Sequence, residues 1–188
     1  MITLTQLWMP IVGSAIAVFV LSSLVHMVLK WHNSDYRKLA NEDEVRAAIR
    51  ASHAAPGQYA VPHCLDMAAM KTPEQVQKFN DGPVGLIVLK ASGQPQMGPA
   101  LGLWFLYTVV IAIFAGYLAS RAVPAGAAFA AVFRVVATVA FLAFTGGSVQ
   151  NGIWLGKPWS SVAKDLLDGL IYGAAMGAMF GALWPAGG

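Results

Sequence analysis

The chain has 188 residues, of which 57% are hydrophobic and only 11% are charged. An average soluble domain carries about 25% charged residues, and a water-soluble globule this apolar would lack enough polar surface to cover itself. The composition therefore argues against a soluble domain and favours an integral membrane protein. The net charge of +3 does not indicate a nucleic-acid partner, because the basic residues gather beside an apolar segment, where the lipid bilayer is the simpler partner.

The first apolar run covers residues 7–29 and is long enough to cross a hydrocarbon layer of about 30 Å. Trp8 and Trp31 flank it, as aromatic residues do at membrane interfaces. A cleaved signal peptide is the alternative, but no Lys or Arg precedes the run and no small-residue cleavage site follows it. We therefore expect residues 1–31 to contain a retained transmembrane helix.

Residues 32–97 differ sharply and hold most of the charges of the chain. Two helices are expected here, one starting after Asn41 and one after Thr72, because each N-capping residue is followed three residues later by Glu or Gln. Residues 58–61 and 84–90 are strand candidates. The segment is expected to form a small α+β lobe, and a loose tether is the alternative.

Residues 98–188 contain three further apolar stretches, at about 99–120, 125–148 and 165–184. The first two are separated by a very short connection, which predicts an antiparallel pair of helices. A polar and tryptophan-rich loop is expected over residues 150–161.

The last stretch contains a glycine at every fourth position, namely Gly169, Gly173, Gly177 and Gly181. This spacing places the four glycines on one face of a helix. Such a ladder costs roughly 1 kcal/mol per glycine in an isolated helix, but in a bilayer it lets another helix approach closely. We expect a glycine zipper, and these four residues are the predicted helix-packing site.

The predicted fold is an all-α membrane protein of four transmembrane helices, with a small cytoplasmic α+β lobe between helices 1 and 2. The orientation follows from the excess of Lys and Arg in cytoplasmic loops. Basic residues on the expected cytoplasmic side are Lys30, Arg37, Lys38, Arg46, Lys90, Lys157 and Lys164, against Arg121 on the other side. Residues 32–97 would then be cytoplasmic, with both termini outside.

Two residues are candidates for a polar or ligand-binding site. Arg134 lies about ten residues inside the expected third span, where a charge is costly and must find a partner; the alternative is a shifted helix in which Arg134 snorkels outward. Asp168 and Asp165 begin the fourth span, where the helix dipole alone favours an acid. A site role for Asp168 would require a cation from another helix.

One cluster of soft ligands is present, formed by His63, Cys64, Met67 and Met70. Thiolate, imidazole and thioether suit Cu(I), and the last three would share a face in a helix. Met and a lone Cys are also common core residues, so no metal site is predicted.

The remaining histidines offer no metal-ligand spacing. His26, His32 and His53 are not at i, i+4, and His26 is read as an interfacial histidine. Motifs of nucleotide binding, zinc proteolysis, serine hydrolysis and dithiol chemistry are missing from the sequence. No cofactor and no catalytic residue are expected.

Several motifs resemble those of a group of small bacterial four-span membrane proteins that carry no assigned function. The motifs are Phe133-Arg134-Val135, Ile153-Trp154 with Pro158-Trp159, Asp168-Gly169-Leu170-Ile171-Tyr172, Phe180-Gly181-Ala182-Leu183-Trp184-Pro185 and Gly82-Pro83-Val84-Gly85. The resemblance implies the bacterial inner (cytoplasmic) membrane and supplies no mechanism.

Packing signals outnumber catalytic ones, so the leading hypothesis is a non-enzymatic helix-packing subunit or scaffold, associating with itself or with another membrane protein. The second hypothesis is a small transporter or sensor with a polar path near Arg134 and Asp168. A third is copper handling through residues 63–70.

Overall fold

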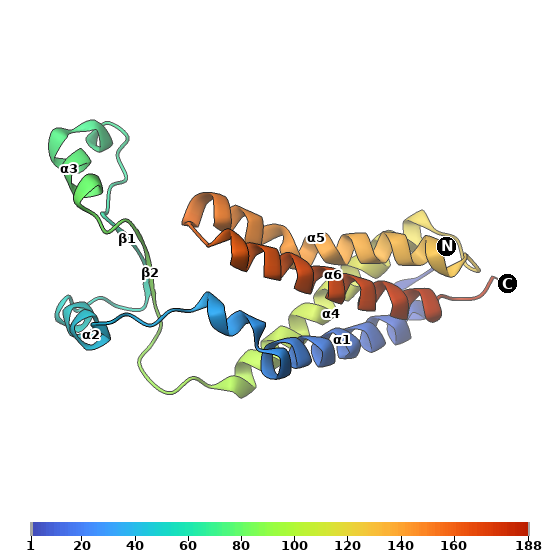
Figure 1. Cartoon of the computed structure of the whole chain (residues 1–188). Coiled ribbons are helices and arrows are strands. Elements are labelled where there is room, and N and C mark those ends of the chain that lie inside the picture. Colours follow the sequence, from blue (N-terminus) through green and yellow to red (C-terminus); the bar gives the residue numbers. More distant parts are fainter. Residues whose placement is uncertain (1, 188) are drawn as a thin grey trace. The chain divides into compact units, whose positions relative to one another are not determined.

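The computed structural model describes residues 2–187, which form two compact units. One unit holds residues 2–36, 96–153 and 157–187, and consists of long helices. The other holds residues 37–95 and 154–156 and contains a small sheet. Figure 1 shows both, with the helical unit in blue, yellow and red.

The helical unit contains three helices that are long and apolar enough to cross a membrane, Leu4–Leu29, Met97–Ala122 and Phe129–Leu155. This agrees with an integral membrane protein. The first is built from a 3₁₀ turn η1 (Leu4–Leu7), α1 (Trp8–Ser23) and a π-helical turn η2 (Leu24–Leu29); the others are α4 and α5. The fourth long helix, α6 (Trp159–Ala182), carries charges in its first half and is not among the three.

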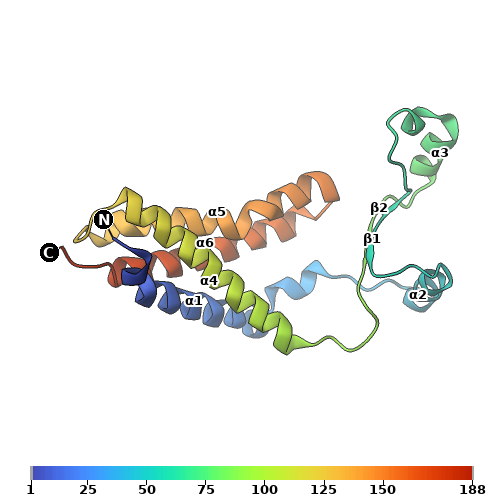
Figure 2. The same cartoon turned by 180° about the vertical axis from the view of Figure 1, so that it is seen from behind.

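Helix α6 packs against α1 and against α5, whose residues meet the glycines of α6. Helix α1 also packs against α4, and both views show α4 crossing the bundle obliquely (Figures 1 and 2). The core is apolar and fully buried. Its largest members include Leu7, Val18, Val132, Val136, Met176 and Phe180. In a bilayer, close van der Waals packing of this kind holds helices together, because lipid chains give no hydrophobic drive between them.

The glycines of α6 face α5 at very short range. A Cβ atom built on Gly173 would lie 2.8 Å from the carbonyl oxygen of Ala137, and one on Gly177 would lie 3.0 Å from the carbonyl oxygen of Phe133. At Gly181 the Cβ would meet the ring of Phe129 at 2.6 Å. Any larger side chain at these positions would force the two backbones apart.

The helix boundaries differ from those expected at the junction of α5 and α6. The expected third span 125–148 is observed from Phe129 to Leu155, and the expected fourth span 165–184 begins already at Trp159. The predicted loop 150–161 is therefore mostly helical. The reason is that nothing in residues 150–155 breaks a helix, whereas Gly156 takes a left-handed conformation with φ 71° and Pro158 follows.

The second unit contains the elements that were expected of the lobe. Its helices are α2 (Glu42–Ala51) and α3 (Pro73–Asp81), with a 3₁₀ turn η4 (Ala69–Lys71). Strands β1 (Gly57–Val61) and β2 (Gly85–Leu89) pair antiparallel, Gly57 opposite Leu89. The Thr72 hydroxyl accepts a hydrogen bond from the backbone N–H of Gln75, as predicted for an N-cap. Asn41 occupies the N-cap of α2, but its side chain makes no capping hydrogen bond.

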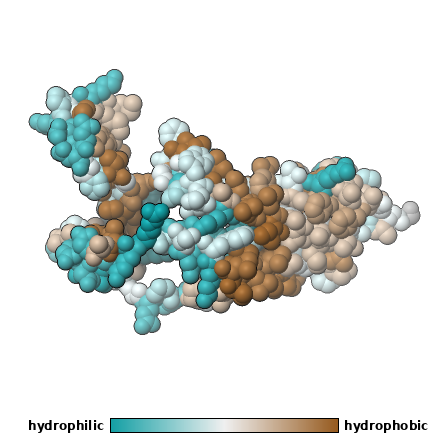
Figure 3. Space-filling view, viewed as in Figure 1, coloured by the Kyte–Doolittle hydropathy of each residue, from teal (hydrophilic) through white to brown (hydrophobic). Residues whose placement is uncertain are grey.

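The outward surfaces of the three apolar helices expose large hydrophobic side chains. Examples are Ile16 and Val20 on α1, Leu106 and Phe114 on α4, and Leu142 on α5. Figure 3 shows hydrophobic residues covering much of the visible face of the helical unit. A patch of this extent on a soluble monomer would be unusual, whereas lipid chains cover it naturally.

Candidate polar site at one end of the helical unit

Two histidines six residues apart are brought together by a break in the helix at Lys30. His26 lies in the π-helical turn η2, which ends at Lys30. Lys30 adopts a left-handed conformation with φ 53°, and the chain then turns into a 3₁₀ segment, η3 (Trp31–Asp35). As a result the ring of His32 stacks on that of His26, with centroids 4.8 Å apart and an interplanar angle of 7°.

Asp168 of α6 meets both imidazoles through a single oxygen. Its Oδ2 lies 2.9 Å from Nε2 of His32 and 3.8 Å from Nε2 of His26. The Asp168 side chain is 8% exposed. Its other oxygen, Oδ1, is buried and has no hydrogen-bond partner among the described residues. A carboxylate in this position is costly unless a positive charge or donor compensates it.

The other ring nitrogen of each histidine is already occupied. Nδ1 of His26 is 3.0 Å from the carbonyl oxygen of Ser22, and Nδ1 of His32 is 2.7 Å from Oδ2 of Asp35. Carbonyl and carboxylate oxygens only accept hydrogen bonds. Both Nδ1 atoms therefore carry the hydrogen and donate it, and both Nε2 atoms are left to face Asp168.

Lys164 fixes the η3 segment on α6. Its Nζ donates to the carbonyl oxygen of Trp31 at 2.8 Å, to Oγ of Ser34 at 2.7 Å and to Oδ1 of Asp35 at 2.6 Å. The hydrogen bond from Lys164, followed by that from His32, lowers the pKa of Asp35 to about 2. Asp35 is therefore a carboxylate at neutral pH, and it holds His32 in one orientation.

A second ion pair lies next to this cluster. Oδ2 of Asp165 accepts hydrogen bonds from Nζ of Lys157 and from Oγ of Ser148. Asp35 and Asp165 thus each have a lysine. Asp168 is different, because no Lys or Arg pairs with it anywhere in residues 2–187, and only the two imidazoles face it.

Three cavities adjoin the cluster: one of about 300 Å³, one of about 160 Å³, and a third of about 220 Å³ that reaches it at His26 alone. The first is lined by polar residues, namely His26, His32, Asp35, Tyr36, Lys157, Pro158, Ser161 and Asp165. The second reaches among the helices and is lined by His26, Trp104, Phe144, Ser148, Asp165, Asp168, Gly169 and Tyr172. The Tyr172 hydroxyl is buried and has no hydrogen-bond partner in the described part of the chain. The cluster therefore lies between a polar cavity and an aromatic one.

The structure does not bring Arg134 to Asp168. Arg134 is exposed and lies in the second turn of α5, because that helix begins only at Phe129. The α5 residue beside this part of α6 is Thr145, packed on Gly169, and it is about 16 Å along the helix from Arg134 at 1.5 Å per residue. Arg134 and Asp168, the two candidate polar residues, therefore do not meet in one site, and the exposed position of Arg134 agrees with the snorkelling alternative.

The soft-ligand cluster is not assembled either. Residues 63–66 form no helix, so Cys64, Met67 and Met70 do not share a helical face. The Cys64 thiol donates to the carbonyl oxygen of Asp66 at 3.5 Å. Among the described His, Cys, Asp and Glu side chains, the group that could hold an ion together is instead His26, His32 and Asp168. The sequence analysis missed these two histidines as partners of Asp168.

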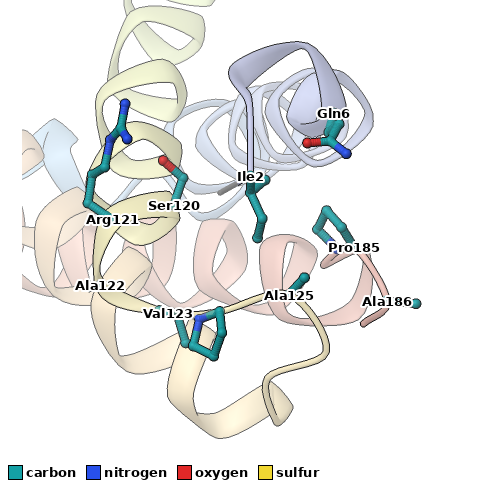
Figure 4. Close-up of a pocket in the computed structure, with 10 residues that line it drawn as sticks. Ile2, Gln6, Ser120, Arg121, Ala122, Val123, Ala125, Pro185 and Ala186 are labelled. Carbon is teal, nitrogen blue, oxygen red and sulfur yellow. The ribbon is translucent and has the colours of Figure 1, made fainter. Parts of the chain in front are cut away.

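A further cavity of about 490 Å³ lies where the ends of the described chain meet the turn after α4. Figure 4 shows Ile2 and Gln6 on one side of it, Ser120 and Arg121 at the end of α4, and Pro185 near the C-terminal end. The Arg121 guanidinium lies 5.4 Å from the centre of the Tyr117 ring. Its lining contains no His, Cys, Asp or Glu among the described residues, and so no metal-ligating group like that of the Asp168 cluster.

The Asp168 cluster offers two imidazole nitrogens and one carboxylate oxygen at the edge of an apolar bundle. Such a set can hold a proton, shared between His32 and Asp168, or a metal ion. Comparison with known proteins finds no matching family model, no similar curated protein and no similar solved structure.

Proposed function

We propose that this chain is a four-span integral membrane protein that works as a small transporter or sensor. Its ligand site consists of His26, His32 and Asp168, hereafter the His–His–Asp site. The observation that carries the proposal is the buried Asp168 carboxylate, which has no Lys or Arg partner among the described residues and keeps one oxygen unpaired. Ionisable residues of this kind are rare in membrane helices and mark ion or substrate pathways.

The packing of α6 supports its role as the fourth span. Its 24 residues correspond to about 36 Å, which is enough to cross the hydrocarbon layer. Its polar residues do not face lipid, because Lys164, Asp165 and Asp168 are bonded within the bundle. At the far end, the Trp184 indole donates to the carbonyl oxygen of Pro124, beside the turn that joins α4 to α5.

The charge distribution supports the proposed orientation. Lys30, Lys157 and Lys164 lie at the end where the first apolar helix stops and α6 starts, whereas Arg121 and Arg134 lie at the other end. Arg37, Lys38 and the other basic residues of segment 32–97 add to this excess of positive charge, which supports a cytoplasmic location for residues 32–97. Both termini then face outward. The motif resemblance described above supports a bacterial inner membrane.

A scaffold is the second candidate, and one observation favours it. Cβ atoms built on Gly98 and Gly102 of α4, or on Gly146 and Gly147 of α5, would meet nothing within 4 Å. These surfaces could receive a helix of another copy or of another membrane protein. The glycine zipper of α6 cannot serve this purpose, because α5 of the same chain already covers it.

Cysteine labelling tests the proposed function. Cys64 is the only cysteine, so a Cys64→Ser background allows single cysteines to be placed at will. In cells and inverted vesicles, Asp168→Cys should react with a membrane-impermeant maleimide from the cytoplasmic side only. Met176→Cys, two turns deeper and fully buried, should not react, and Ala186→Cys should react from the opposite side. Absence of labelling at position 168 from both sides would contradict an accessible site.

A further inference from the structure

We propose that the His–His–Asp site binds a divalent first-row transition-metal ion, with Zn²⁺ as its simplest representative. This inference rests on the proposed function and names its ligand class. His26 and His32 would each contribute Nε2, and Asp168 would contribute Oδ2. The ion would be the cargo or the signal of the protein.

The distances between the three atoms suit one ion. All three lie within 4.8 Å of one another, and the two distances from Asp168 Oδ2 are 2.9 Å and 3.8 Å. Zn²⁺ binds nitrogen and oxygen ligands at about 2.0–2.2 Å in tetrahedral geometry, which separates neighbouring ligand atoms by about 3–4 Å. The distances therefore suit one ion, and rotation of at least one of the two stacked rings would bring both Nε2 lone pairs onto it.

The hydrogen-bond pattern leaves a place for a positive centre at this point. Both Nδ1 atoms donate to oxygens, so each Nε2 atom can act as a ligand when its imidazole is neutral. The Asp168 carboxylate is itself only an acceptor, so the 2.9 Å contact between its Oδ2 and Nε2 of His32 needs a proton when no ion is bound. A metal ion would replace that proton and would also engage Nε2 of His26, which lies 3.8 Å from the same oxygen.

The groups behind the ligands are those that metal sites use. Metal-binding histidines usually donate their second N–H to a carboxylate or a backbone carbonyl, which fixes the ring and raises its basicity. Asp35 does this for His32, and the Ser22 carbonyl does it for His26. Asp35 is in turn held by Lys164.

The ligand set and the surrounding space define the class of ion. Two imidazoles and one carboxylate suit zinc or iron-type ions, whereas Ca²⁺ and Mg²⁺ prefer sites made of oxygen ligands alone. The unpartnered Oδ1 of Asp168 and the half-exposed His26, beside a cavity of about 300 Å³, leave room for further coordination and for the arrival of the ion.

Metal titration of the full-length protein in detergent tests the inference. After removal of metal with EDTA, Zn²⁺ is titrated in competition with a chromophoric chelator, and Co²⁺ is added separately for its absorption spectrum. We expect one Zn²⁺ per chain and a tetrahedral Co²⁺ spectrum, with no competition from Mg²⁺ or Ca²⁺. His26→Ala, His32→Ala and Asp168→Asn should each weaken Zn²⁺ binding at least 100-fold, and Asp35→Asn should weaken it about 10- to 100-fold.

Matched controls keep the test specific. His63→Ala and Asp43→Asn remove the same side-chain types outside the site, since Asp43 is 92% exposed in the lobe, and both should bind Zn²⁺ within about threefold of the wild type. His26→Ala is the critical variant, because His26 is half-exposed and its loss should leave the fold intact.

Two results would overturn the inference. One is a wild-type protein that takes up no Zn²⁺, and the other is unchanged binding in His26→Ala. Neither result affects the labelling of Asp168→Cys, which needs no metal. A labelled position 168 without Zn²⁺ binding would leave the proposed function standing with a proton as the ligand, whereas failure of labelling would remove both.

Discussion

The two halves of α6 are held in place by different means. The first half, up to Tyr172, is fixed by directional bonds from Lys164, Asp165 and Asp168 to side chains and backbone of other elements. The second half is fixed by close approach, with Gly173 and Gly177 against the backbone of α5. The second half therefore supports the fold by close packing alone. The first half keeps one oxygen of Asp168 without a hydrogen-bond partner among the described residues, so it is the half that can bind a ligand.

The largest effect is expected from Gly173→Leu. The first added carbon would lie 2.8 Å from the carbonyl oxygen of Ala137, a backbone atom that cannot move without shifting α5. We expect a loss of about 3 kcal/mol or more of unfolding free energy, seen as a lower thermal midpoint and aggregated material on size exclusion. Gly98→Leu, the same change in open space, is the matched control and should behave as wild type.

Unlike Gly173→Leu, Asp168→Asn should not lower the free energy of unfolding. The amide removes a buried charge that no Lys or Arg compensates in the described chain, and its NH₂ group can donate to Nε2 of His32. Unfolding free energy in metal-free buffer should stay the same or rise by about 1 kcal/mol, while Zn²⁺ binding is lost. A destabilisation as large as that of Gly173→Leu would show that Asp168 serves the fold, and the contrast between the two halves would fail.

Lys164→Met should weaken Zn²⁺ binding indirectly, because Lys164 holds the η3 segment that carries His32. Without the three hydrogen bonds from Nζ, η3 loses its anchor, and Zn²⁺ affinity should fall about 10-fold as His32 is released. Lys164→Arg, which can still donate, is the control and should recover part of the affinity.

The same variant has a pH signature. The pKa of Asp35 is lowered to about 2, so its contribution to stability is present above about pH 4 and is lost as the pH falls through 2. The difference in thermal midpoint between wild type and Lys164→Met should therefore be constant from pH 7 to about pH 4 and shrink toward pH 2. A difference that disappeared near pH 6 would assign the effect to histidine instead.

The smallest effect is expected from Arg134→Ala. The side chain is exposed near the start of α5, so unfolding free energy should change by less than about 0.5 kcal/mol and Zn²⁺ binding should not change. A strong loss of binding in this variant would restore the original hypothesis of a polar path near Arg134.

Much of the fold could be predicted from local patterns. Apolar runs predicted the three long helices, and Thr72 with Pro73 predicted the start of α3. The glycines from Gly169 to Gly181 indicated a closely packed helix face. The ends of α5 and α6 could not be placed, because polar residues such as Gln150 and Asn151 were read as a loop although a helix tolerates them near its end. The error at α5 made Arg134 look buried.

The site was only half visible in the sequence. Asp168 was recognised as an acid in an apolar helix that needed a cation from elsewhere. His26 and His32 were not recognised, since a spacing of six residues puts two side chains on different faces of an α-helix. Their stacking depends on the left-handed Lys30 and on the 3₁₀ segment that follows it, a helix break that no periodicity rule describes.

The π-helical turn at Leu24–Leu29 makes the stacking of His26 on His32 sensitive to the deletion of a single residue. Such a turn accommodates one residue more than an α-helix of the same extent, and His26 sits inside it. Deleting a single neighbour such as Val25 would let the helix rewind into ordinary register and swing the imidazole about 100° around the axis. The shortened chain would keep His26, His32 and Asp168 and would still be long enough to cross the lipid. The rings of His26 and His32 would no longer stack, however, so their alignment depends on the number of residues in the turn as much as on which residues they are.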